Sequence, residues 1–367
     1  MNLGAAAAVV ALTAVTAGLA WTQGLQAAAV LLLLGLGYGF VLQRTRLCFA
    51  SAFYGNRELL RGILLGLAVA SAGSALVMAL GWNRPPRIPF GLHTLVGSAL
   101  FGFSMPFAGG CMTGTLYRLG TGQSKSLAAF LGILVGNGLG AAYTWPLTER
   151  LLDQGWRIFL PDLIGLGPAT VLNLAALSVL YLRLGPRPSP VPSAANPGTF
   201  LERVFEHPWP AWVGGTAFAL LFVIQFAYHS ALGVQLPLAR FVLWAAGTVD
   251  PGVRDLPWAR YWGMRIPALD PGFHLDVGLI LGALTGALLA GEFAGFRAWR
   301  MREALTGFLG GVGMGVAVWV AIGCNVSGFW SAVATLRVDG WIYALGLYLG
   351  ARAGLRATTF LVGRRFL

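Results

Sequence analysis

Long apolar runs separated by short arginine-bearing segments dominate the sequence. Runs of about 20 apolar residues are long enough to cross a bilayer as helices, whereas shorter ones fit re-entrant half-helices. The pattern therefore predicts an all-α polytopic membrane protein with about nine to ten transmembrane helices and about four half-helices. The expected spans are residues 3–20, 27–42, 59–80, 94–110, 126–146, 163–182, 211–228, 275–294, 304–323 and 340–362, and the expected half-helices are 47–54, 112–119, 231–245 and 325–336.

Composition agrees with a chain that is surrounded mainly by lipid. Hydrophobic residues make up 57% of the 367 residues and charged residues only 10%, whereas soluble domains carry about 25% charged residues. The net charge of +12 comes from basic residues that lie between the spans. We therefore assign this charge to membrane topology and lipid headgroups, with attraction of an anionic solute as the alternative, and we expect no nucleic-acid partner.

The arginines also predict the orientation in the membrane. Arg44, Arg46, Arg57 and Arg61 follow the second expected span, and with ten spans they fall on the same side as both chain ends. Because basic loops stay in the cytoplasm, both termini are expected there. Residues 3–20 lack the basic start and small-residue cleavage site of a signal peptide, so they are interpreted as a span.

An internal repeat centres on two of the three cysteines. Counting back from Cys111 and from Cys324, glycine stands one, nine and fourteen residues earlier in both places. A fainter match of residues 40–43 with residues 222–225 sets Cys48 opposite Ser230. The expected topology makes the two halves inverted repeats, a plan in which the solute site lies where the halves meet. We divide the chain into an extra N-terminal segment 1–26, a first half 27–184, a Pro- and Ser-rich cytoplasmic linker 185–199, and a second half 200–367 with an outer polar loop near 248–274.

The glycines before the cysteines mark breaks in the helices. Gly110 and Gly323 stand where a long apolar run gives way to a short one, and a broken helix at membrane depth is tolerated where it lines a cavity. The polar residues Thr113, Asn325 and Ser327 follow these breaks; they could hydrogen-bond a solute or simply cap the short helices.

The thiols themselves favour a soft anion as the solute. No two cysteines have C-x-x-C spacing, which argues against a metal site or a dithiol pair. A buried cysteine is ordinarily a packing residue, but two at equivalent points of a repeat indicate a function. No carboxylate or lysine lies near the centre of an expected span, so a proton relay is not predicted, and neither is any cofactor.

The motifs Arg46-Leu-Cys48, Gly109-Gly-Cys-Met-Thr-Gly114 and Gly323-Cys-Asn-Val-Ser-Gly328, set in duplicated glycine-rich spans, resemble the YeeE/YedE family of sulfur-compound transport proteins. The resemblance implies an hourglass-shaped inner-membrane protein that takes up thiosulfate. It further implies a pathway along Cys48, Cys111 and Cys324 by transient S–H···S contacts, and delivery to a separate cytoplasmic sulfur carrier or sulfurtransferase.

The sequence thus predicts a thiosulfate permease and not an enzyme. Its expected pathway residues are Arg46, Cys48, Gly110, Cys111, Thr113, Gly323, Cys324, Asn325 and Ser327. Arg46 attracts the anion in this interpretation, or else only anchors in headgroups. The alternatives are a transporter of another sulfur or selenium species such as sulfite, a membrane-embedded persulfide enzyme, and a structural subunit with inert thiols.

Overall fold

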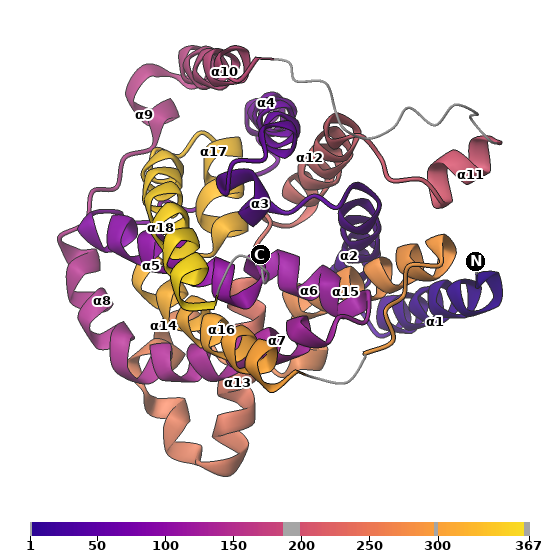
Figure 1. Ribbon diagram of the computed structural model, residues 1–367. Helices are drawn as coiled ribbons and strands as arrows, with labels where there is room; N and C mark the ends of the chain where they lie inside the picture. Colours follow the sequence, from indigo (N-terminus) through magenta and orange to yellow (C-terminus); the bar gives the residue numbers. More distant parts are fainter. Residues whose placement is uncertain (1, 186–198, 297–299, 363–367) are drawn as a thin grey trace.

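The computed structural model describes residues 2–185, 199–296 and 300–362 (Figure 1). Apart from its two end residues, the predicted linker 185–199 lies outside the described residues, as do the C-terminal residues 363–367. The described part of the chain is helical and contains no strand longer than an isolated bridge. The all-α prediction is confirmed.

The long helices coincide with the predicted spans. Within the described residues, nine stretches are long and apolar enough to cross a membrane, which confirms the polytopic class. They contain every long helix given in the next sentence except α18. The long helices are α1 (Leu3–Thr22), α2 (Gln26–Thr45), α4 (Arg57–Ala79), α5 (Leu92–Ala108), α7 (Ser124–Leu139), α10 (Leu166–Arg183), α12 (Ala211–Tyr228), α15 (Pro271–Ala290), α16 (Met301–Ala321) and α18 (Asp339–Val362).

Short helices occupy the four pieces predicted as half-helices. They are α3 (Phe49–Phe53), α6 (Met112–Gly120), α13 (Gln235–Val249), and the π-helical turn η4 (Asn325–Trp330) continued by α17 (Ser331–Ala334). The remaining elements connect the long helices: η1 (Gly140–Thr144) and α8 (Trp145–Asp153) extend α7, α9 (Leu160–Ile164) precedes α10, and α11 (Phe200–Phe205) precedes α12. The predicted polar loop near 248–274 is partly helical, with η2 (Pro251–Asp255), α14 (Pro257–Trp262) and η3 (Pro267–Leu269).

The two helices that precede the repeated cysteines, α5 and α16, cross at a reciprocal contact. A Cβ atom on Gly97 would overlap the backbone of Ala321, and a Cβ atom on Gly310 would overlap the backbone of Ala108. Each contact joins a glycine fourteen residues before its cysteine to an alanine three residues before the other cysteine. This exchange of equivalent positions between antiparallel helices is the contact that an inverted repeat predicts.

Glycines that recur every four residues along a helix pack helices of one half against helices of the other. On α18, Gly346, Gly350 and Gly354 abut the backbone of α5, and on α7, Gly132 and Gly136 abut the backbone of α16. Small residues allow this close approach in lipid, where hydrophobic burial does not drive helices together. These glycines therefore act in helix packing.

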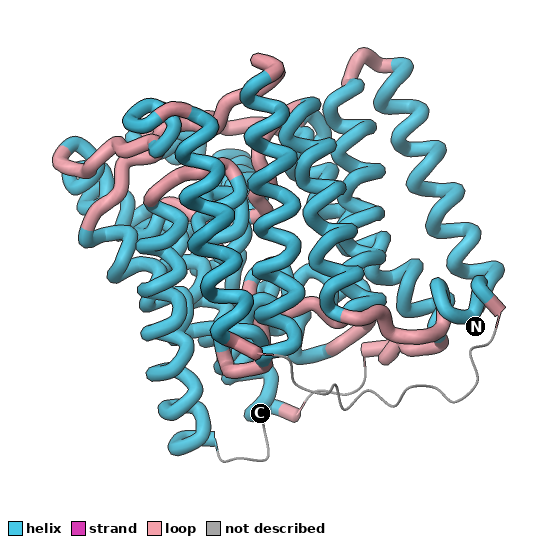
Figure 2. The backbone as a smooth tube through the Cα atoms, turned by 90° about the horizontal axis from the view of Figure 1, so that it is seen from above, coloured by secondary structure: helices cyan, strands magenta, loops and turns pink. Residues whose placement is uncertain are grey.

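The helices α2 and α15 run in parallel, so their C-terminal ends lie together. Gly35 abuts Leu275, and Gly39, one turn later, abuts Leu279. The start of α1 lies at the same end, because the N–H of Asn2 donates to the carbonyl of Leu288 (3.0 Å). This common end is called the Glu292 face below, after the residue that follows α15; Figure 2 shows the long helices side by side with the N-terminus at one end of the bundle.

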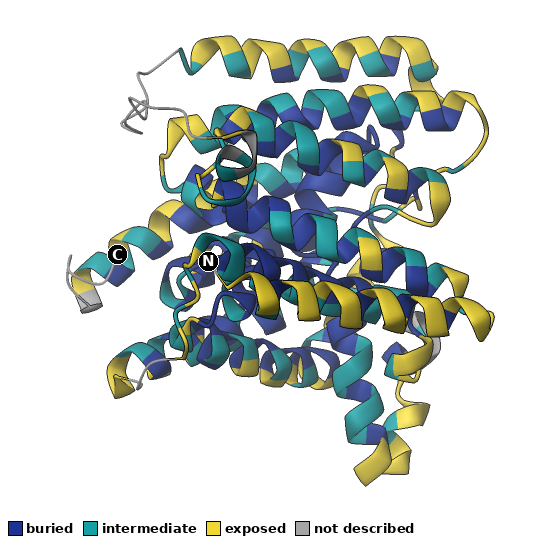
Figure 3. Ribbon diagram, turned by 90° about the vertical axis from the view of Figure 1, so that its right-hand side faces the viewer, coloured by how far each residue is buried: buried dark blue, intermediate teal, exposed yellow. Residues whose placement is uncertain are grey.

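Burial follows the arrangement expected in a bilayer. Figure 3 shows buried residues in the middle of the bundle and exposed residues along its outer helices. On α10, Val171, Leu172 and Leu182 are exposed although apolar, and α1 likewise exposes Leu12 and Val15. Such outward apolar surfaces are suited to lipid contact and place the polar and thiol groups of interest in the interior.

Candidate functional site

Each of the three cysteines is the residue immediately before a short helix. Cys48 precedes α3, Cys111 precedes α6 and Cys324 precedes η4. All three are buried, with exposures of 2%, 0% and 0%, and all are free thiols. The chain therefore changes direction at every cysteine, and each thiol lies at a helix break in the protein interior.

The thiols of Cys48 and Cys111 share one close neighbour. Both sulfur atoms lie 3.3 Å from the position that a Cβ atom would take on Gly114. The backbone N–H of Gly114 donates to the Cys111 sulfur (3.3 Å). A side chain at position 114 would crowd both sulfurs, so glycine here leaves room for the pair.

Cys324 is held by its own helix break in the second half. Its N–H donates to the Ser327 hydroxyl oxygen (2.9 Å), and that hydroxyl donates to the Cys324 sulfur (3.5 Å). Tyr343 of α18 donates its hydroxyl proton to the carbonyl of Gly323 (3.0 Å). Tyr343 also lies near both Cys324 and Cys111, so one residue neighbours thiols of the two halves.

The polar residues after the breaks divide into two kinds. Ser327 is used within the break, as described, and so serves as a cap. Thr113 and Asn325 are 1% and 0% exposed, yet the Thr113 hydroxyl and both amide atoms of Asn325 have no hydrogen-bond partner among the described residues. A buried polar atom without a partner costs roughly 1–3 kcal/mol. The Thr113 hydroxyl and the Asn325 amide are therefore candidates for hydrogen bonds to a solute.

The predicted break glycines have different structural roles. Gly323 has φ +148°, and Ile322 before it has φ +56°, so the backbone at this break is in a region that side chains disfavour. Gly110 has no such φ; instead, a Cβ atom there would lie 2.9 Å from Nη1 of Arg118 and 3.9 Å from the Cys48 sulfur. Glycine at position 110 therefore lets a guanidinium approach the thiol pair.

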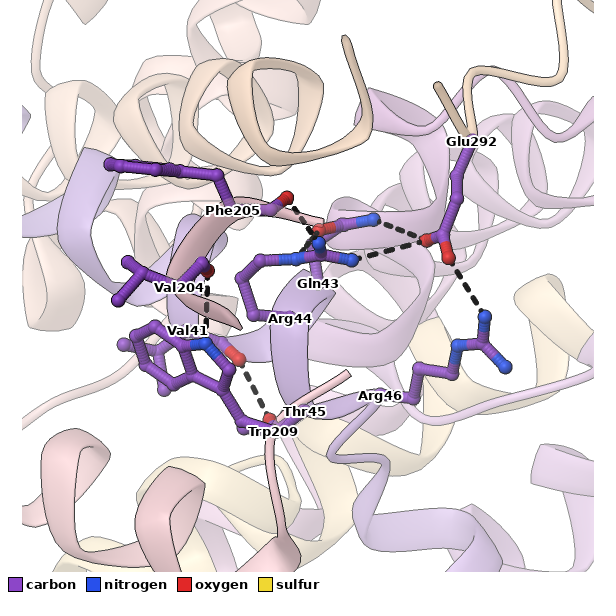
Figure 4. A network of polar contacts seen from close by, with 9 residues as sticks. All are labelled: Val41, Gln43, Arg44, Thr45, Arg46, Val204, Phe205, Trp209 and Glu292. Atoms are coloured by element: carbon purple, nitrogen blue, oxygen red, sulfur yellow. Dashed lines mark hydrogen bonds and ion pairs between the residues drawn. The ribbon is translucent and has the colours of Figure 1, made fainter. Parts of the chain in front are cut away.

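Arg46 lies on the Glu292 face and is not in contact with the thiols. Its side chain is 66% exposed and donates to Oε1 of Glu292 (2.9 Å). The other carboxylate oxygen of Glu292 accepts from Gln43 (2.8 Å) and from the buried Arg44 (3.4 Å). Arg44 in turn donates to the carbonyl of Phe205, so one carboxylate connects α2, α15 and α11 (Figure 4).

Two cavities open at opposite ends of the parallel pair α2 and α15. The first, of about 670 Å³, lies at the Glu292 face and is lined by Gln43, Arg46, Ser51, Tyr117, Arg118 and Glu292 among others. The second, of about 270 Å³, lies near the N-terminal ends of α2 and α15, and its lining includes Gln225, Ser230, Gly323, Ser327, Ser331 and Arg337. The first cavity thus leads toward the Cys48–Cys111 pair and the second toward Cys324.

The sequence reasoning missed Arg118 and Tyr343. Arg118 was visible only as a basic residue after the fourth span, and the direction of its side chain depends on how α6 folds back. Tyr343 lies nineteen residues after Cys324 in an ordinary apolar helix, so no local pattern distinguishes it. Both became candidates because tertiary contacts bring them to the thiols.

Comparison with known proteins places the chain in a family. Residues 44–353 match the sequence profile described as Sulphur transport. The chain belongs to this family. The resemblance predicted from the cysteine motifs is confirmed.

Among relatives of the family, the thiosulfate transporter TsuA of Spirochaeta thermophila is 26% identical over 87% of this chain and 95% of its own length. TsuA of Escherichia coli is also 26% identical, over 87% of this chain and 91% of its own length. The probable transporter YedE of Salmonella typhimurium is 33% identical, but the match covers 42% of this chain and only 40% of that protein.

Proposed function

We propose that this chain is a permease through which thiosulfate enters the cell along a path lined by Cys48, Cys111 and Cys324. The single observation that carries the proposal is the placement of all three free thiols at buried helix breaks, between two cavities at opposite ends of the bundle. Family membership and the full-length likeness to TsuA proteins support a sulfur compound as the solute.

Thiosulfate fits this lining for chemical reasons. The dianion carries a polarisable terminal sulfur and three oxygens, so it can meet thiols with its sulfur and hydrogen-bond donors with its oxygens. The Thr113 hydroxyl and the Asn325 amide supply such donors beside Cys111 and Cys324. In this proposal Gly110 and Gly323 keep the breaks narrow, Ser327 orients the Cys324 thiol, and Arg46 adds positive charge at the mouth of the larger cavity.

We infer that the Glu292 face is the cytoplasmic one. Arg44, Arg46 and the start of α1 all lie there, and basic residues are retained on the cytoplasmic side. The protein would then reside in a bacterial inner membrane, with the smaller cavity receiving thiosulfate from outside. The larger cavity would deliver the anion to a separate sulfur carrier or sulfurtransferase.

Uptake of ³⁵S-thiosulfate by a bacterium that lacks its own thiosulfate uptake tests the proposal. Expression of the chain should restore uptake, and Cys111→Ser or Cys324→Ser should reduce the initial rate by about tenfold or more, the effect of about 1.4 kcal/mol in barrier height. Ser74→Ala is a matched control, because it also changes one buried atom, on α4, and Ser74 is not among the residues lining the two cavities.

Four results would contradict the proposal in different ways. Absence of uptake by well-expressed wild type would remove thiosulfate as the solute, and full inhibition by sulfite at equal concentration would favour that anion. Wild-type uptake by both serine variants would remove the thiol path. Stable ³⁵S labelling of the protein under non-reducing conditions would favour a persulfide enzyme.

A further inference from the structure

Arg118 supplies the larger cavity with a cation that no carboxylate neutralises. Its Nε donates to the hydroxyl of Tyr117 (3.2 Å) and its Nη1 to the carbonyl of Gly109. The ion pairs among the described residues include no partner for Arg118. Glu292 is the one carboxylate among the described residues that line this cavity, and it is already shared between Arg44 and Arg46. Arg118 therefore adds a positive charge to the cavity.

The guanidinium lies directly beside the thiol pair. Nη1 of Arg118 and the sulfur of Cys48 lie 2.9 Å and 3.9 Å from the same point, the place where a Cβ atom of Gly110 would be. An anion that touches the thiols from the cavity side would therefore meet this guanidinium at the same time.

The internal repeat places a neutral residue at the position in the opposite cavity that corresponds to Arg118. Ser331 stands seven residues after Cys324, as Arg118 stands seven residues after Cys111, and each lines the cavity on its own side. The two cavities share further equivalent lining positions, counted from Cys48 and Ser230: Gln43 with Gln225, and Ser51 with Gly233. They are repeat-related cavities, and Arg240 and Arg337, which also line the smaller one, are ion-paired with Asp270 and Asp339.

We propose that Arg118 is the residue that binds the anion after it has passed the thiols, and that it makes the path asymmetric. The anion is a dianion with oxygens that a guanidinium can hold by charge-assisted hydrogen bonds, an interaction roughly twice as strong as a neutral one. This inference rests on the proposed transport of thiosulfate and adds a binding position to it. Because Ser331 is neutral, the opposite cavity binds the same anion more weakly at the equivalent position.

A purely structural role for Arg118 has a different signature. Gly109 ends α5, so a donor to its carbonyl also caps that helix. A capping role alone would change the unfolding temperature of the unliganded protein and leave thiosulfate binding unaltered. A binding role changes the response to thiosulfate itself.

The test compares Arg118→Gln with Arg118→Lys in two assays. Initial rates of ³⁵S-thiosulfate uptake give KM and maximal rate, and thermal unfolding of the purified full chain in detergent gives the shift caused by added thiosulfate. Arg352→Gln is the control. The guanidinium of Arg352 lies 5.4 Å from the centre of the Tyr348 ring, much as that of Arg118 lies 5.6 Å from the centre of the Tyr117 ring. Arg352, however, is exposed on α18.

We expect Arg118→Gln to lower the ratio of maximal uptake rate to KM by about tenfold or more, because one charge-assisted contact is lost. Arg118→Lys keeps the positive charge but lacks the paired N–H donors of the guanidinium. It should fall between Arg118→Gln and wild type in both uptake and thermal shift. The thiosulfate-induced shift of Arg118→Lys remains measurable even if the Gln variant does not fold.

The outcomes separate this inference from the proposed function. Wild type that fails to transport thiosulfate contradicts the proposed function itself. Wild type that transports, together with an Arg118→Gln variant within twofold of it, overturns the role of Arg118 alone. An Arg118→Lys variant with a full thiosulfate shift and only a lowered unliganded unfolding temperature reduces Arg118 to a helix cap, which also overturns the inference.

Discussion

Replacing Gly114 by alanine would disturb the Cys48–Cys111 pair without removing either thiol. The new Cβ atom would lie 3.3 Å from each sulfur, closer than the 3.5–4.0 Å at which carbon contacts are optimal. Both sulfurs would have to move by a few tenths of an ångström, and they would have to move apart. The change therefore acts on the spacing of the thiols more than on their chemistry.

The expected effect on stability is small because two contributions oppose each other. Overpacking a buried site costs about 1–3 kcal/mol, whereas alanine in place of glycine inside a helix gains about 1 kcal/mol. Gly114 lies within α6 and retains its N–H donor to Cys111 after the change. The variant should fold, with an unfolding temperature within a few degrees of wild type, and should transport thiosulfate several-fold more slowly.

A suitable control is Gly138→Ala in α7. The added Cβ atom there meets only Val242, at an ordinary 3.6 Å, so the helix gains propensity without crowding. Uptake and thermal unfolding would be measured for both variants in parallel. Wild-type uptake by a folded Gly114→Ala variant would refute the reasoning that the spacing of the thiol pair matters.

Three further predictions concern the scaffold around the site. Glu292→Gln leaves the buried Arg44 without its carboxylate, so we expect a loss of about 1–3 kcal/mol in stability, seen as a lower unfolding temperature in detergent. Gly310→Val places a side chain against the backbone of Ala108 and should prevent accumulation of folded protein in membranes. Tyr343→Phe removes the donor to the Gly323 carbonyl; we expect a loss of about 1 kcal/mol and slower thiosulfate uptake.

Matched variants sharpen each of these comparisons. Glu303→Gln breaks the exposed pair with Arg300 at 3.8 Å, and surface pairs contribute about 0–1 kcal/mol. An equal loss in both glutamine variants would contradict the role of Arg44. Gly18→Val meets nothing within 4 Å, and its accumulation should be normal. If Gly310→Val also accumulates normally, the α5–α16 crossing is not as tight as described. Unchanged unfolding and uptake of Tyr343→Phe would show that the break at Gly323 is held by other contacts.

The sequence alone determined the parts of this protein that depend on local pattern. The apolar runs identified the membrane spans because a helix must satisfy its own backbone hydrogen bonds in lipid. The offsets of glycine from Cys111 and Cys324 indicated an inverted repeat, and the contacts of Gly97 and Gly310 agree with it. The motif residues also identified the family without any structure.

Only the tertiary structure decided which side chains meet. Cys48 and Cys111 are 63 residues apart in sequence, and their proximity results from where α3 and α6 begin in space. Arg118 is an ordinary interfacial arginine until the turn at Gly109–Gly110 brings its guanidinium to the thiols. Arg46, which sequence reasoning placed on the path, lines the larger cavity and is ion-paired with Glu292. Hydrophobic periodicity specifies which segments enter the membrane, but the direction of a long polar side chain depends on close packing between segments that no local pattern records.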